Sequence, residues 1–325
     1  MNVFVTGAEG FIGSHLVEDL VRRGHKVKAL CLYNSFSNIG WLSELPTEIS
    51  KEVELVFGDV NDSELISTQM AHQEQVFNLA ALIAIPYSYK APRSYVQTNV
   101  VGALNILEAA RANATHVIQI STSEVYGNPE TTPITENHSL KPQSPYAASK
   151  SSADLLALAH HATYGIPVTV VRPFNTYGPR QSMRAVIPTI LSQFIEGKKV
   201  IHLGNLETKR DFTFVKDTCK GILDIAKNIE SIGEVTQLGT GEVVSVSDIV
   251  SVAKELTGME VEIQTDRSRI RPEASEITVL HSDPTKARGA IGWNPQVNLK
   301  EGLAITLAWI RENYSKLGES GRYHI

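Results

Sequence analysis

Three glycines spaced three residues apart follow the first apolar run of the chain and constrain its fold more than any other feature. The run Asn2–Thr6 reads as a short strand, and a helical pattern begins near Ile12. Glycines at such a strand-to-helix turn let backbone N–H groups approach a pyrophosphate and aim a helix N-terminus at its charge. The turn therefore predicts a dinucleotide site with contacts from Gly7, Gly10, Phe11, Ile12 and Gly13.

Short β-branched runs then alternate with helix-period segments. We expect strands at Lys26–Leu32, Val53–Phe57, Gln75–Leu79, His116–Ile120 and Val168–Val171, and helices at Ile12–Arg23, Ser63–His72, Val96–Asn113 and Pro145–Tyr164. This alternation is typical of an α/β fold with a Rossmann-type, doubly wound parallel sheet.

The order becomes irregular after about Phe174, which predicts a smaller C-terminal α/β substrate lobe. We expect a dinucleotide-binding domain at 1–174 and a mainly substrate-binding lobe at 175–325, with Thr213–Lys227 able to return to the first domain. The elements expected in this part are helices at Ala185–Glu196, Val215–Asn228, Val246–Leu256 and Lys300–Asn313, and strands at Val200–Leu203 and Val261–Gln264.

Composition narrows the class of protein. A hydrophobic share of 42%, a charged share of 20% and a net charge of -5 are those of an ordinary globular chain and favour no nucleic-acid partner. No stretch approaches the roughly 18 apolar residues of a membrane span. Cys31 and Cys219 are too few for a disulfide framework, and the scattered histidines form no metal motif. We expect a cytoplasmic protein without a metal or a membrane partner.

The end of the second predicted strand lacks the acid that usually binds the adenosine ribose. It also lacks an arginine for the 2′-phosphate of NADP. Asn34 and Ser35 are then the candidates for the ribose hydroxyls, and NAD is favoured over NADP without settling the choice. Asp59, after the third strand, is either an acceptor for the adenine amino group or a helix cap before Asp62.

Tyr146 and Lys150 lie four residues apart on a predicted helix, so both occupy one face. A lysine there can favour the phenolate form of the tyrosine, although a packed tyrosine beside a snorkelling lysine is the commoner reason for this spacing. Thr122 and Glu124 follow the fifth strand, at the sheet edge where open α/β folds bind ligands. Thr122 could hold a sugar hydroxyl, and Glu124 could act as a base.

These residues resemble the extended short-chain dehydrogenase/reductase family, which contains the nucleotide-sugar epimerases and dehydratases. The resemblance spans nearly the whole chain and includes Arg172–Asn175, Tyr177–Pro179, Arg210–Phe212 and Arg271–Glu273. It implies further cofactor contacts, beside Tyr146 and Lys150, from Val60, Leu79, Ala80, Ala81, Asn99 and Pro173. It also implies a homodimer formed by a four-helix bundle of Val96–Asn113 and Pro145–Tyr164.

Within the family, Glu124 resembles the dehydratases, because C4-epimerases usually have a small residue there. The resemblance implies that Tyr146 takes the C4 hydroxyl proton, Glu124 removes the C5 proton, and the hydride lost from C4 returns to C6 after water leaves. Many dehydratases have an aspartate where this chain has Ser123. The acid for the leaving hydroxyl is then either protonated Glu124 or a water held by Ser123.

The resemblance also implies which residues bind the substrate. A nucleotide-sugar diphosphate is expected to contact Asn175, Arg184, Arg210, Arg271 and Glu273, with the guanidinium groups on phosphate. The segments 32–42 and 271–276 resemble the dehydratases of legionaminic acid synthesis, which act on UDP- or GDP-N-acetylglucosamine.

Four functions stay open on these residues. The first is a nucleotide-sugar 4,6-dehydratase, a lyase, and the second a C4-epimerase, an isomerase. The third is a UDP-glucuronate decarboxylase, which shares the Ser-Thr-Ser-Glu stretch but needs cations near the sugar carboxylate. The last is a catalytically inactive dinucleotide sensor, against which Thr122, Tyr146 and Lys150 argue.

Overall fold

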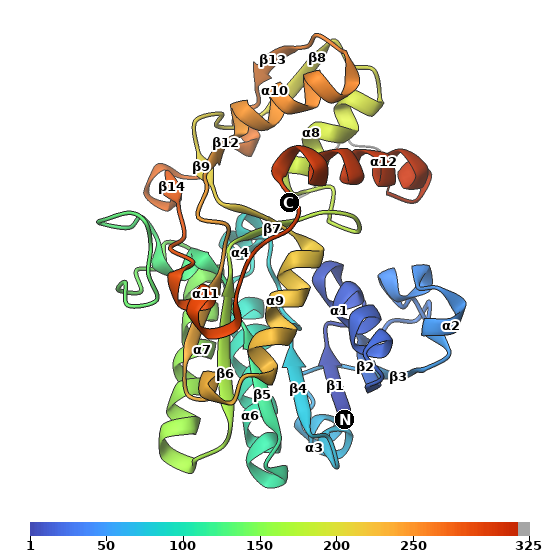
Figure 1. The fold of residues 1–325 in the computed structure, drawn as a ribbon, viewed down its shortest axis with the longest axis vertical. Helices are drawn as coiled ribbons and strands as arrows, with labels where there is room; N and C mark the ends of the chain where they lie inside the picture. Colours follow the sequence, from blue (N-terminus) through green and yellow to red (C-terminus); the bar gives the residue numbers. More distant parts are fainter. Residues whose placement is uncertain (318–325) are drawn as a thin grey trace.

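The computed structural model describes residues 1–317, and a seven-stranded sheet forms the centre of its first lobe (Figure 1). All neighbouring strands run parallel. Across the sheet the order is β3 (Val53–Gly58), β2 (Lys26–Leu32), β1 (Asn2–Thr6), β4 (Gln75–Asn78), β5 (His116–Ile120), β6 (Val168–Pro173) and β11 (Val235–Leu238). The chain winds outward from β1 to β3 and restarts at β4, so β1 and β4 flank the switch point where such sheets bind ligands. The predicted doubly wound sheet is confirmed.

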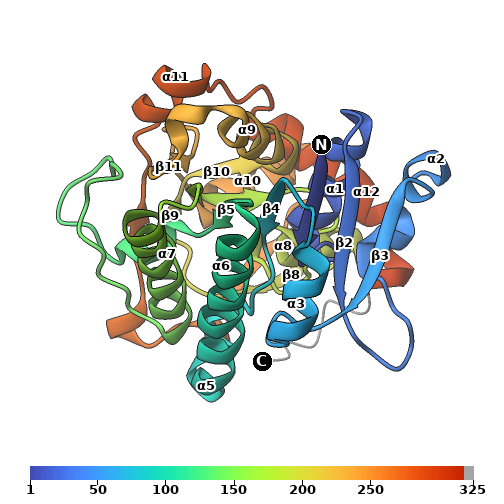
Figure 2. The same cartoon turned by 90° about the horizontal axis from the view of Figure 1, so that it is seen from below.

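Helices cover both faces of this sheet, as Figure 2 shows from below. One face carries α1 (Phe11–Arg22), α9 (Val215–Lys227) and α11 (Thr285–Ile291), and the other carries α3 (Ser63–Met70), α6 (Gly102–Asn113) and α7 (Pro145–Tyr164). Leu16 and Ile222 bury the first interface, while Ile106 and Val117 bury the second. Two-sided cover explains why the strands read as nearly continuous apolar runs.

Shorter elements connect these layers. They are η1 (Gly40–Glu44), α2 (Thr47–Ser50), α4 (Ile85–Lys90), α5 (Pro92–Tyr95), the π-helix η2 (Val96–Val101), η3 (Ser123–Tyr126) and η4 (Ile229–Ser231). The helix expected at Val96–Asn113 thus begins with a π-helical stretch. Such stretches often occur at functional sites.

The second lobe has a separate apolar core, which includes Ile190, Phe194, Ile249 and Leu303. It consists of α8 (Val186–Ile195), α10 (Val246–Thr257) and α12 (Leu299–Leu317) around the parallel pair β8 (Val200–Leu203) and β13 (Glu262–Thr265). Short strands and turns join the lobes: β7 (Asn175–Tyr177), β9 (Lys209–Arg210), β10 (Phe212–Phe214), β12 (Val244–Ser245), η5 (Arg267–Arg269), η6 (Glu273–Ser275) and β14 (Val279–Leu280). Residues 318–325 of the predicted second lobe lie outside the described residues.

The chain crosses between the lobes more than once. The segment from α9 to β11 lies in sequence after α8 and β8 of the second lobe, yet α9 packs on α1 and β11 pairs with β6. Strand β11 was not expected, because Val235-Thr236-Gln237-Leu238 carries two buried polar residues in the space of four. Gln237 tolerates burial because its amide nitrogen donates to the carbonyl oxygen of Asp283 at 2.9 Å.

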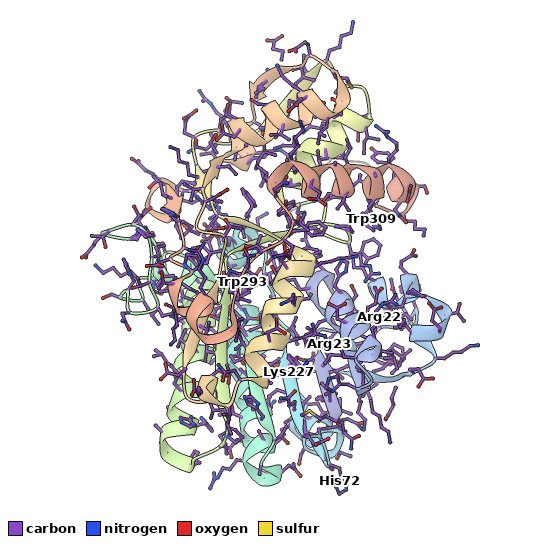
Figure 3. The ribbon with its side chains drawn as sticks, viewed as in Figure 1. Arg22, Arg23, His72, Lys227, Trp293 and Trp309 are labelled. Carbon is purple, nitrogen blue, oxygen red and sulfur yellow. The ribbon has the colours of Figure 1, made fainter. Side chains whose placement is uncertain are left out.

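The C-terminal helix α12 contacts the first lobe at η1. The rings of Trp41 and Trp309 meet edge to face with centroids 5.2 Å apart, and Figure 3 shows Trp309 on the side of α12 that faces the first lobe. Lys316 also donates to Glu44 at 2.8 Å. None of the helices within residues 1–317 combines the length and the apolar character that a membrane span requires.

Candidate active site

The glycine turn forms a backbone cradle at the carboxyl end of β1. Gly7 has φ +62°, and a Cβ there would lie 2.8 Å from the nitrogen of Ala80. A Cβ on Gly13 would lie 2.1 Å from the carbonyl oxygen of Gly7, and Gly10 is the N-cap of α1. Phe11 and Ile12 form the first residues of that helix. A cradle that any side chain would fill suits a pyrophosphate at a helix N-terminus.

The loop after β4 is fixed to the same cradle. The backbone nitrogen of Ala80 donates to Thr6 Oγ1 at 3.1 Å, and Thr6 donates to Asn78 at 2.8 Å. The predicted cofactor residues Leu79, Ala80 and Ala81 therefore lie beside the glycines. Asn99, from η2, holds Leu82 through both its amide atoms and donates to Ser149 on α7 at 2.9 Å. Its side chain fastens the loop to α7.

The residues predicted to bind the adenosine end have other partners. Both atoms of the Asn34 side-chain amide hold its own loop: Oδ1 accepts from the nitrogens of Phe36 and Asn38, and Nδ2 donates to the carbonyls of Leu32 and Asn38. The side-chain amide of Asn34 thus has all its donors and acceptors engaged within its own loop, and its contact with the ribose stays a prediction. Ser35 is exposed.

Asp59 is not the helix cap that the sequence left open. Asp62 caps α3 by accepting from the nitrogen of Leu65 at 3.0 Å. Asp59 Oδ1 accepts from the backbone and side-chain nitrogens of Asn61. The neighbouring Val60 is buried against Gly102. Pro173, at the end of β6, is buried as well.

Thr122, Glu124 and Tyr146 meet beyond the end of β5. Thr122 is the N-cap of η3, and its Oγ1 accepts from the nitrogen of Glu124 at 3.2 Å. The Thr122 hydroxyl also hydrogen-bonds Tyr146, and both Glu124 and Ser123 are buried. Burial raises the pKa of the Tyr146 phenol, the Thr122 hydrogen bond lowers it, and the charge of Glu124 raises it again. A hydroxyl, a carboxylate and a phenol thus share one small volume.

Lys150 lies one helical turn beyond Tyr146, on the face that the sequence predicted. Its ammonium donates to the carbonyl oxygen of Ile120, and burial lowers the pKa of Lys150 to about 8, against the opposing effect of Asp154. Among the protein's own groups, burial dominates and raises the pKa of the Tyr146 phenol. That Lys150 favours the phenolate, together with a bound nicotinamide ring, stays a prediction.

Behind Lys150 lies a buried ion pair. Asp154 accepts from Arg172 Nε at 3.0 Å and from Ser121 Oγ at 2.7 Å. Burial raises the pKa of Asp154, whereas Arg172 lowers it. This ion pair was not predicted, because Asp154 and Arg172 come from different elements, α7 and β6.

Two arginines from the second half of the chain reach this place. Arg271 Nη1 lies 3.5 Å from Glu124 Oε1, and Arg210 Nη2 lies 3.8 Å from Glu276 Oε1. Burial lowers the pKa of Arg210, Glu124 raises it, and Arg271 lowers it further. Arg271 Nη1 is buried without a hydrogen-bond partner. Both predicted guanidinium groups therefore converge on Glu124 and leave donors for an anionic ligand.

The remaining predicted substrate residues differ in burial: Asn175 Oδ1 is buried, whereas Arg184 and Glu273 are exposed. Asn175 Oδ1 is buried and has no hydrogen-bond partner, so a ligand donor would satisfy it. Arg184 is exposed and reaches Ser182 at 3.5 Å. Glu273 is exposed too, and the carboxylate that faces Arg210 is instead Glu276. The short turn η6 rotates Glu276 inward and Glu273 outward. In residues 1–317 no cluster of side chains has the composition of a metal site.

The fold and this site together are those of an enzyme of the extended short-chain dehydrogenase/reductase class. The chain belongs to the GDP-mannose 4,6 dehydratase family, whose model matches residues 4–306. It is 34% identical over 318 residues to a dTDP-glucose 4,6-dehydratase from Streptomyces antibioticus, covering 96% of this chain and 93% of that protein.

Solved structures of two activities resemble the chain equally well. A dTDP-glucose 4,6-dehydratase from Streptomyces venezuelae with NAD bound has a TM-score of 0.86 and 29% identity, covering 97% of this chain and 98% of that chain. A UDP-glucuronic acid 4-epimerase from Bacillus cereus, also with NAD, has a TM-score of 0.89 and 27% identity, covering 97% and 100%. Overall similarity therefore does not separate dehydration from epimerisation.

Proposed function

We propose that this chain is an NAD-dependent nucleotide-sugar 4,6-dehydratase of the cytoplasm that acts on UDP- or GDP-N-acetylglucosamine. The observation that carries the proposal is Glu124, a buried carboxylate at the Thr122–Tyr146 pair with Arg271 at 3.5 Å. Epimerisation at C4 needs no second base at this place, whereas elimination of water across C5 and C6 does.

In the proposed reaction the bound NAD supplies the hydride acceptor at C4 and the hydride donor at C6. Thr122 orients the C4 hydroxyl and Tyr146 accepts its proton. Glu124 takes the C5 proton, which the 4-ketone makes acidic, and Arg271 Nη1 lies 3.5 Å from its carboxylate. The proton for the leaving C6 hydroxyl comes from Glu124 or from a water at Ser123, and C5 takes up a proton when the hydride returns to C6. Arg210 and Asn175 bind the diphosphate.

Product masses test the proposal directly. The purified chain is incubated with NAD and either UDP- or GDP-N-acetylglucosamine. We expect one of the two to lose one water, which also identifies the nucleotide. Glu124→Gln should slow that loss about 10²- to 10⁴-fold and leave NAD affinity unchanged, because only C5 deprotonation loses its base. An unchanged mass with inverted C4 would instead establish an epimerase.

One observation favours a second candidate, a UDP-glucuronate decarboxylase. Such an enzyme needs cations near the sugar carboxylate, and Arg210 and Arg271 both lie close to Glu124. Incubation with UDP-glucuronate and NAD separates the two candidates. Release of carbon dioxide would support decarboxylation, and its absence together with dehydration of an N-acetylhexosamine substrate would support the lyase.

We also propose a homodimer through η2, α6 and α7. Val96, Leu155 and Tyr164 are 52%, 58% and 47% exposed on these helices, and apolar side chains of this size gain from burial at an interface. Light scattering should give twice the chain mass. Leu155→Glu should yield a monomer, and Ile305→Glu, a change at an exposed apolar residue of α12, should not.

A further inference from the structure

Glu9 places a carboxylate at the carboxyl end of β2, where the strand itself has no acidic residue. It belongs to the turn between β1 and α1, yet its Oε1 accepts from the backbone nitrogen of Leu32, the last residue of β2, at 2.9 Å. Its carbonyl oxygen accepts from the nitrogen of Trp41 at 3.0 Å. The side chain of Glu9 therefore reaches the carboxyl end of β2, the position from which dinucleotide folds bind the adenosine ribose.

The second oxygen of this carboxylate lacks a donor. Glu9 Oε2 is buried and has no hydrogen-bond partner in the protein. The loop after β2 holds Glu9 in place, since a Cβ on Gly40 would lie 2.5 Å from the Glu9 carbonyl oxygen. A buried carboxylate oxygen without a donor is costly, and a ligand hydroxyl would relieve that cost.

The other polar side chains after β2 are less suited to the ribose. The Asn34 amide holds its own loop, and Ser35 is exposed. The sequence from Leu32 to Glu44 contains neither lysine nor arginine. A 2′-phosphate placed here would meet the Glu9 carboxylate without a neighbouring cation from this loop, and like charges at such distances repel strongly.

We propose that Glu9 binds the 2′,3′-diol of the adenosine ribose and excludes the 2′-phosphate, so that this one residue makes the enzyme selective for NAD over NADP. The inference rests on the proposed function in one respect, that a dinucleotide binds the glycine turn. It adds the residue that selects between the two dinucleotides.

Calorimetric titration of the full chain with NAD and with NADP, after removal of any copurified dinucleotide and without nucleotide sugar, tests the proposal. The wild type should bind NAD more tightly than NADP. Glu9→Gln keeps the size of the side chain and an acceptor for Leu32 but removes the charge. It should weaken NAD binding about 10- to 100-fold, the usual effect of losing a charged hydrogen bond, and leave NADP binding equal or tighter.

Two further variants sharpen the result. Glu9→Asp retains the charge and shortens the reach, so NAD binding should weaken while NADP stays excluded; this variant carries the test if Glu9→Gln does not fold by circular dichroism. Glu44→Gln removes a carboxylate from the same loop region, where Glu44 pairs with Lys316, and should leave the NAD-to-NADP preference unchanged.

The outcomes distinguish this inference from the proposed function. A preference for NAD that collapses in Glu9→Gln and survives in Glu44→Gln supports the inference. A wild type that binds both dinucleotides equally, or a Glu9→Gln variant that keeps the wild-type preference, overturns the role of Glu9 alone. A wild type that binds neither dinucleotide overturns the proposed function together with it.

Discussion

The glycine turn and the arginine pair serve one candidate site but are built differently. The turn lies within seven consecutive residues, and a Cβ on Gly7 or Gly13 would collide with backbone atoms. The arginine pair collects side chains from separate segments, with Arg210 on β9 facing Glu276 and Arg271 facing Glu124. A backbone cradle accepts almost no substitution, whereas a side-chain cluster can change its ligand by one substitution. The glycine turn should therefore tolerate few substitutions, whereas the arginine pair should be more tolerant of them.

The strongest test of the backbone cradle is Gly13→Ala. The new Cβ would lie 2.1 Å from the Gly7 carbonyl oxygen, so the turn must open. We expect NAD binding to fall below detection and the free energy of unfolding to drop by about 3 kcal/mol, as for severe overpacking. The matched control is Gly289→Ala in α11, where a Cβ meets open space, which should raise stability by about 0.5 kcal/mol. Chemical denaturation and calorimetry measure both, and unchanged NAD binding in Gly13→Ala would contradict the cradle.

A substitution in the arginine pair should change only the affinity for the nucleotide sugar. Arg271→Gln removes a guanidinium at Glu124, so the affinity for nucleotide sugar should fall about 10- to 100-fold with NAD binding unchanged. Arg267→Gln, on the exposed turn of the same segment, should change neither affinity. Equal losses in the two variants would mean that Arg271 acts only through the general charge of the segment.

The buried ion pair of Asp154 and Arg172 lies behind Lys150 and should affect how activity and stability depend on pH. Because the pKa of Lys150 is about 8, kcat should fall as pH rises through that value and the ammonium loses its proton. Folding lowers this pKa from 10.5, so between pH 8 and 10.5 the unfolded chain binds more protons, and Lys150 makes the free energy of unfolding rise with pH. Activity and stability should thus move in opposite directions.

Asp154→Asn removes the carboxylate that holds this pKa up. The fall in kcat should then begin about one pH unit lower, which means about fivefold less activity at pH 8. Glu108→Gln, a partly exposed carboxylate that pairs with His160 on α7, should keep the wild-type profile. A pH profile in Asp154→Asn that coincides with the wild type would remove Asp154 from any role at Lys150.

The smallest expected effect concerns the surface contact between lobes. Lys316→Met breaks the exposed pair with Glu44 and should change the free energy of unfolding by no more than about 0.5 kcal/mol. Trp309→Leu, which removes the ring contact with Trp41, should cost more. Thermal unfolding of the two variants ranks the contacts, and a larger loss in Lys316→Met would reverse their order.

The difference between features formed by neighbouring residues and features formed by distant segments also explains how much of the fold and site could be predicted from the sequence. Six strands of the main sheet, the helices on it other than α11, and the Thr122, Glu124, Tyr146 and Lys150 group were predictable, since periodicity and short spacings determine them. Strand β11 was missed because Thr236 and Gln237 are polar and find their partners only after folding. Glu276 was missed in favour of Glu273 because a single turn decides which one faces Arg210. Glu9 was missed because its partner is the end of another strand.

The contact of Trp309 with Trp41 has a kinetic consequence. Trp41 donates to the Glu9 carbonyl, so the loop over the adenosine end is fastened to the C-terminal helix of the other lobe. A dinucleotide bound beneath that loop, as we propose, would leave only if an aromatic contact between the lobes is broken. In the proposed reaction, which returns its hydride within each turnover, release of the dinucleotide serves no purpose. The enzyme should therefore be isolated with its cofactor still attached, in the manner of a prosthetic group.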